Sequence, residues 1–434
     1  MIKDHEVIPD GWQLTNFGDK SLFEILGSGV KYYSGEKRYL STSSIEGQNI
    51  LYSEGDFTFF NRPSRANMQP VENSVWFAKM KNTLKVIVPD QDTIDNTILS
   101  TGFSGIRAKN VHSGFLLQVL LSDHFNNQKN LLAEGSTQEA INNTKVRKIK
   151  FLLPESFAEQ QTIASILSKT DDAIAEIEKL IAKYNRIKTG LMQDLLTKGI
   201  DENGNIRSEE THEFKDSPLG RIPKEWDCEY LGSKVCLRGG YAFKSKDFTS
   251  QGIQLIRIGN LYNNQLSLER DPVFLPLEFV TLFPNFLLSS GDIILSMTGT
   301  AGKRDYGFAV QISSDVQVLL NQRVCKFIFQ DSKVDKDYLL NILHAEFYLS
   351  KLYESVTGTK QANLNSENIL NIYVPFPDIK EQKRIASKIV GVDKTISESK
   401  ITLDKLSKLK VGLMQDLLSG KIRVRNITPN QSAS

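Results

Sequence analysis

The sequence has few of the residues on which metal, disulfide and membrane proteins depend. Its 434 residues include three cysteines and five histidines, and Cys228, Cys236 and Cys325 form no CxxC pair. The cysteines therefore predict neither a disulfide framework nor a zinc site, and the scattered histidines lack metal-ligand spacing. No apolar run reaches membrane-spanning length, and residues 1–6 lack a signal-peptide core. We therefore expect a cytoplasmic protein.

A strong charge of either sign is also missing. The formal net charge is +2, with 40% hydrophobic and 24% charged residues, which is the composition of an ordinary soluble globular protein. The length favours two to three domains. A nearly neutral chain neither requires nor excludes a nucleic-acid partner, so any basic surface must be local.

Recognisable catalytic signatures are absent. Gly299-x-x-Gly302-Lys303-Arg304 is two residues short of a P-loop, and Gly27-x-Gly29 is followed by Tyr32 where a dinucleotide fingerprint needs glycine. The sequence contains no HExxH, GxSxG or Asn-Pro-Pro-aromatic motif. Pro377-Asp378 with Glu381-x-Lys383 imitates a nuclease triad, but capping of a helix start explains its two carboxylates. A hidden nuclease or methylase is one alternative.

One long segment of the chain occurs twice. Gly190-Leu-Met-Gln-Asp-Leu-Leu returns unbroken at Gly412, 222 residues later, and Glu159-Gln160 returns at the same offset as Glu381-Gln382. A single offset held along a whole segment indicates two copies of one rigid element.

Each copy is predicted to form a long α-helix. Ser156-x-x-Glu159 and Asp378-x-x-Glu381 predict capping boxes, and Gly199 and Gly420 predict left-handed C-terminal caps. Between these ends, apolar residues recur with alternating gaps of four and three, which is the seam of a coiled coil. The predicted seam residues are Ile163, Leu167, Ile174, Ile177, Ile181, Tyr184, Leu191 and Leu195, then Ile385, Ile389, Val392, Ile396, Leu403, Leu406, Leu413 and Leu417.

The length of these helices indicates how they pack. At 1.5 Å per residue each is roughly 60 Å long, too long to bury its stripe against one small domain. We therefore expect the two helices to pack on each other. A parallel pair would need some 20 extended residues to carry the chain back, so the short linker favours an antiparallel pair. Packing of each helix on its own domain is the alternative.

The repeat extends to the flanks of the helices and defines the domains. Ile8-Pro9-x-x-Trp12 returns as Ile222-Pro223-x-x-Trp226. The predicted fold class is α+β, with two strand-rich mixed domains, two long helices in an antiparallel coiled coil, and an internal pseudo-twofold repeat. The predicted boundaries are a first domain at 1–154, a helix at 155–199, a linker at 200–217, a second domain at 218–377, a helix at 378–420 and a tail at 421–434.

The middles of the two domains, 20–130 and 235–350, show almost no mutual similarity. Composition predicts strands at 85–88, 254–258, 292–296 and 324–328, and a helix at 337–353. Only short pieces look alike, such as Ile98-Leu99-Ser100 and Ile294-Leu295-Ser296. A constant frame around variable middles suggests that the middles choose a target.

The variable middles and their junctions carry cations interleaved with aromatic and amide side chains. Arginine can form two hydrogen bonds to guanine, asparagine and glutamine can do so to adenine, and Gly-Thr turns can donate to phosphate. These sets are expected in loops between strands; for any single residue, a solvated surface cation is the alternative. The candidate DNA-binding residues are Lys31, Tyr32, Tyr33, Lys37, Arg38, Arg62, Arg65, Arg107, Lys109 and Gln138, then Lys244, Lys246, Arg257, Asn260, Thr298, Thr300, Lys303, Arg304, Gln322, Arg323, Lys360 and Gln361.

Gly190 and Gly412 lie at matching places inside the predicted helices, where glycine costs about 1 kcal/mol. The same cost in both copies indicates that another backbone approaches there, and methionine is an adaptable contact residue. We predict docking sites for two copies of a partner, with a simple kink as the alternative. The docking residues are Gly190, Met192, Gln193, Gly412, Met414 and Gln415.

Several motifs stand in a fixed order along the chain. Pro-x-x-Trp-x(4)-Leu/Phe-Gly begins both domains, and Gly291-Asp292-Ile293-Ile294-Leu295-Ser296 lies in the second with a Thr-Gly turn. Glu-Gln-x-x-Ile-Ala begins both helices, and Gly-Leu-Met-Gln-Asp-Leu-Leu ends them. In this order and content the chain resembles the specificity subunit of type I restriction–modification systems. Gly55-Asp56-Phe57 is only a loose counterpart of Gly291-Asp292-Ile293.

The resemblance implies a DNA-binding subunit with two target recognition domains. Each would read one half of a bipartite, asymmetric site, and the coiled coil would set the spacing. It also implies two modification subunits that carry S-adenosylmethionine and methylate adenine, and restriction subunits that use ATP and Mg²⁺. This chain would bind no cofactor or metal, hold no catalytic residue, and be required for both methylation and restriction. A non-DNA assembly scaffold, whose variable domains bind protein, is the alternative.

Overall fold

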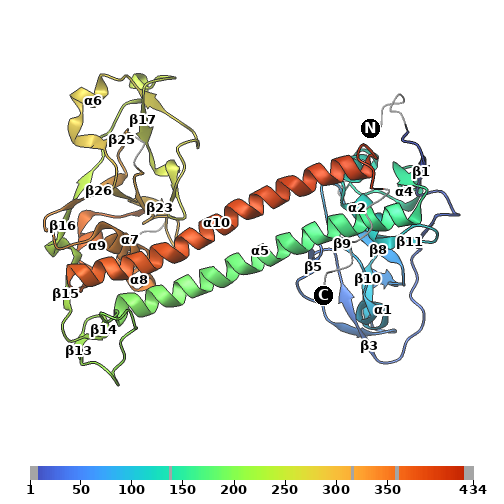
Figure 1. The fold of residues 1–434 in the computed structure, drawn as a ribbon, viewed down its shortest axis with the longest axis horizontal. Helices are drawn as coiled ribbons and strands as arrows, with labels where there is room; N and C mark the ends of the chain where they lie inside the picture. Colours follow the sequence, from blue (N-terminus) through green and yellow to red (C-terminus); the bar gives the residue numbers. More distant parts are fainter. Residues whose placement is uncertain (1–7, 136–138, 314–316, 357–360, 425–434) are drawn as a thin grey trace. The chain divides into compact units, whose positions relative to one another are not determined.

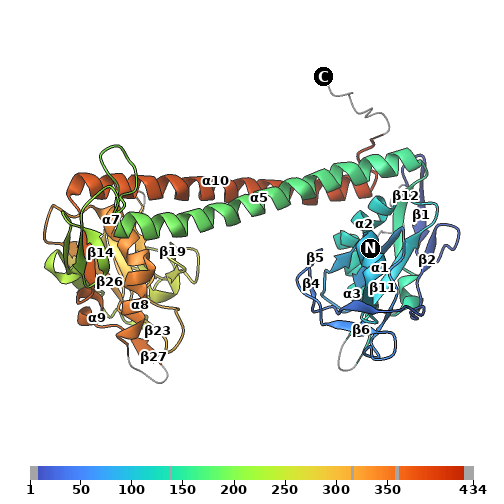
Figure 2. The same cartoon turned by 90° about the horizontal axis from the view of Figure 1, so that it is seen from below.

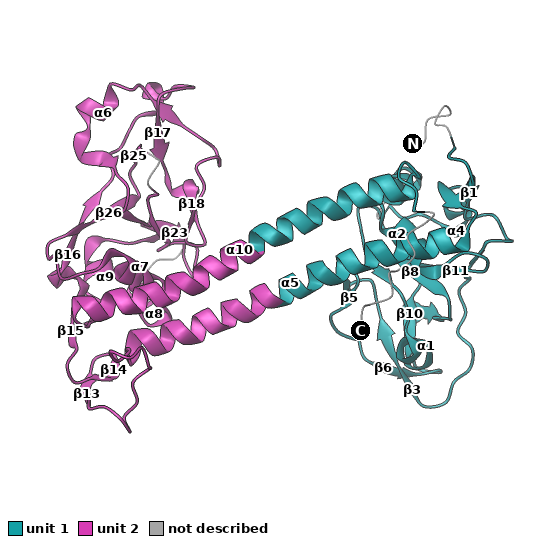
Figure 3. Cartoon of the chain, in the orientation of Figure 1, with its two compact units in different colours: residues 1–179, 400–434 teal, residues 180–399 magenta. Residues whose placement is uncertain are grey.

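The computed structural model describes residues 8–135, 139–313, 317–356 and 361–424. Figure 1 shows its helices and strands, and Figure 2 shows them turned by 90°. The chain divides into two compact units, residues 1–179 with 400–434 and residues 180–399, and both divisions fall inside a long helix (Figure 3). Each unit thus holds one strand-rich domain and part of each long helix. No helix in the described part is long and apolar enough to cross a membrane.

The long helices are α5 (Phe157–Thr197) and α10 (Ile379–Leu418). Every predicted seam residue is buried or half-buried, whereas Ile187, Val390 and Ile401 on other faces are exposed. Gly199 (φ 70°) and Gly420 (φ 69°) follow the helices in the left-handed conformation, which confirms both predicted C-terminal caps.

Each predicted capping box forms one of its two hydrogen bonds, the one from the glutamate N–H to the side chain of Ser156 or Asp378. The N–H of Glu159 donates to Ser156 Oγ (3.4 Å), and the N–H of Glu381 donates to Asp378 Oδ1 (3.1 Å). The two glutamate carboxylates, however, bind arginines that follow the ends of the helices. A guanidinium group bonds a carboxylate more strongly than a neutral N–H does. The glutamate carboxylates therefore bind the arginines and not the backbone N–H of the cap residue.

The described part of the first unit contains two four-stranded sheets and two two-stranded ribbons, one of which pairs β4 with β5. In the sheet of order β6-β3-β10-β7, β3 and β10 are parallel and both outer strands are antiparallel to their neighbours. The sheet of order β2-β11-β8-β9 is antiparallel throughout, and β1 pairs with β12. The strands are β1 (Trp12–Asn16), β2 (Phe23–Ile25), β3 (Glu36–Leu40), β4 (Ile45–Glu46), β5 (Asn49–Ile50), β6 (Asp56–Thr58), β7 (Ala66–Met68), β8 (Ser74–Ala78), β9 (Val86–Ile87), β10 (Thr97–Ser100), β11 (Phe103–Ala108) and β12 (Lys150–Pro154).

The short helices of the first unit pack on both of its sheets, with α2 on the antiparallel sheet and α1 on β3 and β10 of the other. They are α1 (Gln91–Asn96), α2 (Ser113–Leu121), α3 (Asp123–Leu132) and α4 (Asn143–Val146). Aromatic rings fill the core, with Phe17 in contact with Phe23, Phe125 and Phe151. Apolar residues at the start of α5 and the end of α10 join the same cluster, so this domain packs on both helices.

The second unit repeats this strand order. Its sheets are β16-β26-β22-β24, antiparallel throughout, and β20-β17-β25-β21, with β17 and β25 parallel; β15 pairs with β28. The two domains therefore share a topology although their middles differ in sequence. The strands are β13 (Phe214–Ser217), β14 (Gly220–Pro223), β15 (Asp227–Tyr230), β16 (Val235–Gly239), β17 (Ile253–Ile256), β18 (Leu261–Tyr262), β19 (Gln265–Leu266), β20 (Phe274–Leu275), β21 (Leu287–Leu288), β22 (Ile293–Ser296), β23 (Thr298–Thr300), β24 (Ala309–Gln311), β25 (Val318–Leu320), β26 (Val324–Phe329), β27 (Gln361–Asn363) and β28 (Tyr373–Phe376).

The helices of the second unit correct one expectation. The helix predicted at 337–353 is two helices, because Ala345 adopts an extended conformation (φ −73°, ψ 140°) between them. The short helices are α6 (Phe279–Leu282), α7 (Lys336–His344), α8 (Glu346–Glu354), α9 (Ser366–Leu370) and the 3₁₀ turns at Leu231–Ser233, Ser245–Asp247, Ile258–Asn260 and Pro284–Phe286. Trp226, Tyr338 and Tyr348 are the largest side chains of a core that also includes apolar residues of α5 and α10.

Strand pairing also corrects the predicted correspondence of the middles. Ile98-Leu99-Ser100 lies in β10, whose counterpart by topology is β25, whereas Ile294-Leu295-Ser296 lies in β22, the counterpart of β8. The partner of Gly291-Asp292-Ile293 is therefore Asn73-Ser74-Val75 and not Gly55-Asp56-Phe57. Gly291 (φ 79°) and Asn73 (φ 56°) share the left-handed backbone, which supports this register.

Candidate nucleic-acid interface and helix-end sites

In the second unit, the start of α10 is fastened to the chain that follows α5. The carboxylate of Glu381, which is 1% exposed, accepts hydrogen bonds from the N–H of Ile200 (2.9 Å) and from Trp226 Nε1 (3.1 Å). Both terminal nitrogens of Arg207 also donate to it, Nη2 at 3.1 Å from Oε2. Because every partner of Glu381 is structural, this carboxylate is committed to joining the helix ends, which argues against the nuclease alternative.

The first unit has the matching arrangement. Glu159 near the start of α5 accepts from Arg423 Nε and Nη2, each at 2.8 Å, and Arg423 follows α10. The hydrogen bonds from Arg423 hold the pKa of Glu159 below its ordinary value. Arg423 also lies 5.7 Å from the ring centre of Trp12. Neither arginine was found by sequence analysis, because each lies outside the repeated motif.

Ion pairs between the helices show their direction within each unit. Lys188 Nζ contacts both oxygens of Asp393 (2.6 and 2.8 Å) in the second unit, and Lys410 pairs with Asp171 in the first. Lys188 and Lys410 stand 222 residues apart, as do Asp171 and Asp393. In the first unit, Glu159 meets Arg423 and Asp171 meets Lys410, so residue numbers rise along α5 as they fall along α10. The two helices are therefore antiparallel within that unit, and the pairs at Glu381 and Lys188 give the same direction in the second.

Several predicted DNA-binding residues of the first unit gather beside β3 and β6. Tyr33 Oη donates to the Phe57 carbonyl (2.9 Å), and Lys37 Nζ lies 5.3 Å from the Tyr33 ring centre. Tyr32 is 69% exposed and its ring is 5.4 Å from that of Phe59. Lys31 and Arg65 are exposed nearby in sequence, before β3 and β7. This part of the first domain presents cations and aromatic rings together.

Sequence analysis missed two rings of this cluster. Phe60 is 84% exposed, and Phe59 carries the Arg62 guanidinium 4.1 Å from its ring centre. Arg62 Nε also donates to the Ala66 carbonyl (3.1 Å), so this arginine braces the loop. The adjacent Phe59-Phe60 pair before an arginine was the available signal, since exposed aromatic rings are stacking platforms for bases.

Three further predicted residues of the first unit have internal partners. Arg107 and Lys109 were expected in a loop, but Arg107 lies in β11, where it pairs with Glu24 (3.2 Å). Lys109 Nζ donates to the Lys20 carbonyl (3.2 Å), and Arg38 pairs with Asp92. Gln138 lies outside the described residues, as does Lys360 of the second unit.

In the second unit, Arg257, Gln322 and Arg323 converge. They lie where the parallel strands β17 and β25 end, around a cavity of about 440 Å³ that Arg270 also lines. Asn260 lines the same cavity but is buried, and its amide serves the fold by accepting from the N–H of Arg257 (2.9 Å) and donating to two carbonyls. Sequence analysis missed Arg270, which lies in a turn without a repeated motif.

The remaining predicted residues of this unit lie in separate turns. Thr298 and Thr300 belong to β23, and Thr300 stands opposite Gln361 of β27. Arg304 pairs with Glu346 (2.7 Å), whereas Lys303 is exposed in the turn that follows β23. Lys244 and Lys246 are exposed at the 3₁₀ turn Ser245–Asp247.

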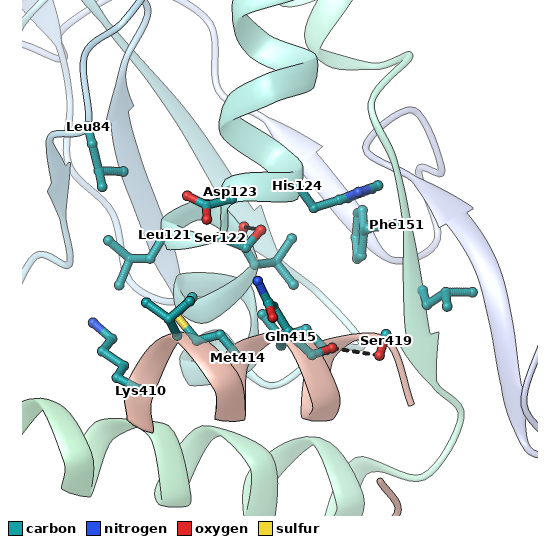
Figure 4. A pocket seen from close by; sticks show the side chains of 14 residues that line it. Leu84, Leu121, Ser122, Asp123, His124, Phe151, Lys410, Met414, Gln415 and Ser419 are labelled. Carbon is teal, nitrogen blue, oxygen red and sulfur yellow. Dashed lines mark hydrogen bonds between the residues drawn. The ribbon is translucent and has the colours of Figure 1, made fainter. Parts of the chain in front are cut away.

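Two of the three predicted docking residues of α10, Met414 and Gln415, line a cavity of the first unit, whereas Gly412 does not. The cavity has a volume of about 430 Å³ and is bounded by α10, the turn between α2 and α3, and β12. Figure 4 shows Met414 and Gln415 facing Leu121 and Ser122 across it. Val411 and Leu418 add apolar surface. At Gly190 and Gly412 nothing lies within 4 Å of an added Cβ, so in the described part of the chain no other segment approaches either glycine.

A metal centre has no counterpart in the described part of the chain. No group of three or more histidine, cysteine, aspartate or glutamate residues there could hold a metal ion. Cys325 is buried, and burial raises the pKa of its thiol to about 12, so it is not a nucleophile at neutral pH.

The two domains share one topology and each packs on both long helices, but their loops differ: the first presents cations beside exposed aromatic rings, and the second presents arginines and amides around a cavity. The family model described as "Type I restriction modification DNA specificity domain" matches residues 23–189 and 223–408. The chain belongs to this family of type I restriction–modification specificity subunits.

Known relatives carry the same description. The chain is 34% identical over 281 residues to the type I restriction enzyme MjaVIII specificity subunit of Methanocaldococcus jannaschii. That match covers 64% of this chain and 63% of the relative, which is less than two thirds of its length. The putative MjaX specificity subunit of the same organism is 26% identical over 333 residues, covering 73% of this chain and 70% of the relative.

Solved structures share the fold. The type I restriction–modification S subunit from M. genitalium has a TM-score of 0.59 at 14% identity, covering 96% of this chain and 98% of that one. A chain from the structure described as "Structural basis underlying complex assembly and conformational transition of the type I R-M system" has a TM-score of 0.58 at 19% identity, covering 96% of this chain and 100% of that one. At these identities the similarity shows the fold alone.

Proposed function

We propose that this chain is the DNA-reading subunit of a type I restriction–modification complex. The observation that carries the proposal is one frame used twice: the two domains share a strand order, whereas their loops present different chemistry. In the first domain these loops offer exposed aromatic rings beside cations, and in the second an arginine-lined cavity. Such loops suit two different DNA sequences, one half-site for each domain.

The two long helices are proposed to form one antiparallel coiled coil that separates the readers under a pseudo-twofold repeat. The buried seam and the matched pairs Lys188–Asp393 and Lys410–Asp171 support this arrangement. The length of the coil would then set the number of base pairs between the half-sites. The domain boundaries expected from sequence remain part of the proposal.

The ends of the helices are proposed as docking sites for two modification subunits. The cavity beside Met414 and Gln415 supports the site in the first unit, because it joins apolar walls to exposed helix surface. At the matching place in the second unit, Leu196 is fully buried whereas Leu418 is half-buried, so the two sites would differ in depth. S-adenosylmethionine, ATP and Mg²⁺ would be bound by partner subunits, and this chain would be needed for both methylation and restriction.

A gel shift with the modification subunit present tests the proposal against the scaffold alternative. The assembled complex is expected to prefer one bipartite sequence over scrambled DNA of the same length. A complex that forms normally but shows no preference for any DNA sequence would support the scaffold and overturn the proposal.

A further inference from the structure

The cavity of the second unit lies where two parallel strands end at the same edge of their sheet. Arg257 follows β17 directly, and Asn321, Gln322 and Arg323 follow β25 before β26 begins. Arg270 closes the cavity from the turn before β20. Parallel neighbours necessarily bring the segments after their carboxyl ends together, which explains how residues far apart in sequence converge here.

Positive side chains outnumber negative ones around the cavity. Three guanidinium groups line it with one carboxylate, Asp271. Arg257 Nη2 donates to the Asp271 backbone carbonyl (2.8 Å) and not to its carboxylate. In the described residues, Arg257 Nε and Asn321 Oδ1 are buried without hydrogen-bond partners. Buried polar groups without partners are uncommon in native proteins, so these two atoms are available to bond a polar ligand.

The backbone aims these side chains instead of leaving them on a loose loop. The N–H of Gln322 donates to the Tyr241 carbonyl (2.9 Å), and the N–H of Met297 donates to the Arg323 carbonyl (2.8 Å). Arg323 has φ 70°, a left-handed conformation that costs about 1 kcal/mol or more for a residue with a side chain and is retained mostly at functional positions. This backbone conformation fixes the direction in which the Cα–Cβ bond of Arg323 leaves the chain.

The same place in the first unit has the same frame and different chemistry. The N–H of Ser41 donates to Ser44 Oγ (3.1 Å), as the N–H of Arg257 donates to Asn260 Oδ1. The N–H of Lys79 donates to the Gly102 carbonyl (2.9 Å), which makes Gly102 the counterpart of Arg323. Where the second unit has Arg257 and Arg323, the first has Ser41, whose hydroxyl donates to Glu54, and Gly102. The backbone frame is therefore the same in both units, whereas the side chains and their charge differ.

We propose that this cavity reads the major-groove edge of a guanine in the half-site of the second domain, with Arg323 as the base-reading residue. Guanine presents two acceptors, N7 and O6, at a spacing that matches the two donors of one guanidinium. Asn321 and Gln322 add amides that can bond a neighbouring base. A phosphate would need only charge, whereas this site joins cations to amides on a rigid backbone. The inference rests on the proposed DNA recognition.

The test is the base preference of the assembled complex, measured on a library randomised across the half-sites. Arg323→Gly removes the side chain and suits φ 70°, so it is expected to fold as the wild type does; Arg323→Lys keeps the charge but loses the paired donors. Both variants are expected to lose roughly 5- to 150-fold of preference for guanine at one position and to keep every other preference. Lys351→Ala, which removes an exposed cation on α8, is the matched control and should change nothing.

The other outcomes separate this inference from the function on which it rests. A uniform loss of affinity for all sequences, with a shallower salt dependence and unchanged preferences, would make Arg323 a phosphate contact and overturn the inference. Unchanged preferences and affinity would overturn it as well. If the wild-type complex itself prefers no sequence, the proposed function fails first, and the inference fails with it.

Discussion

The glutamates at the helix starts show how a single buried charge can fasten two elements that are distant in sequence. Glu381 has four donors from three residues, all on the chain that follows α5. Both charges of the buried Glu381–Arg207 ion pair lose their hydration when the pair forms, which offsets much of their attraction. The pair therefore acts mainly by making alternative arrangements unfavourable, because in these the arginine would be buried without a partner.

Removal of the Glu381 carboxylate should therefore destabilise the folded protein strongly. Glu381→Ala leaves Arg207 buried without its partner and is expected to lower the free energy of unfolding by about 3–5 kcal/mol. Glu159→Ala is the matched change in the first unit and should cost less, because Arg423 is more exposed than Arg207. Urea unfolding of both variants measures the difference; equal losses would contradict this account.

Lys129 is a second buried charge, and among the described residues no carboxylate pairs with it. Its side chain is 1% exposed and donates to the Thr83 carbonyl; burial lowers its pKa to about 8. An unfolded lysine stays protonated up to about pH 10.4, so the folded state binds fewer protons between these values. Folding stability from this group therefore rises as the pH rises from about 8 to about 10.

Lys129→Met isolates that contribution. At pH 7 the variant avoids burying a charge. Above pH 8 the free energy of unfolding of the wild type should rise relative to that of the variant by up to about 1.4 kcal/mol per pH unit. Urea unfolding of both proteins at pH 7, 8.5 and 9.5 gives the difference. A difference that stays constant over this range would mean that Lys129 titrates at its ordinary pKa.

At the scale of the element, two equally exposed positions of α10 can test whether a partner subunit docks on this helix. Val411 (48% exposed) borders the cavity of the first unit, whereas Val390 (49% exposed) lies on the same helix away from it. Val411→Asp places a charge against apolar walls and is expected to lower the number of bound modification subunits from two to one. Val390→Asp, equally exposed, should leave two. Light scattering of the purified complex counts them, and two subunits with Val411→Asp would refute docking at this cavity.

The seam of the helices offers a test of spacing. Seven residues inserted after Lys179 in α5 and after Ser399 in α10 preserve the four-three register and add about 10 Å, or roughly three base pairs. The methylated motif should then contain a spacer longer by about that number, with both half-sites unchanged. Sequencing of methylated host DNA reads this directly. An unaltered spacer would show that the helices do not measure distance.

At the scale of the whole molecule, two domains of one topology should read independently. Exchange of residues 20–130 for the corresponding segment of a relative replaces the loops of the first unit and leaves the second unit untouched. Only one half of the methylated motif should change. If both halves change, each domain does not read its own half-site.

Much of this architecture follows from local patterns. The four-three spacing and the glycines after the helices predicted α5 and α10 to within two residues at each end, because a helix is built from contacts between near neighbours. The strand order had no such signal. Pairing of β3 with β10 or β17 with β25 joins residues some 60 apart, and nothing in either strand names its partner.

The candidate sites divide in the same way. Composition alone identified cation-rich loops, since charge and ring content are visible in any sequence. Which cations are free depends on the fold: Arg107 and Arg304 have carboxylate partners, whereas Arg257 and Arg323 converge with Arg270 on one cavity. Likewise the repeat by itself revealed Glu159 and Glu381, but only tertiary structure chose Arg423 and Arg207 as their partners. Periodic elements are encoded by neighbours along the chain, whereas sites are made by residues that meet only after folding.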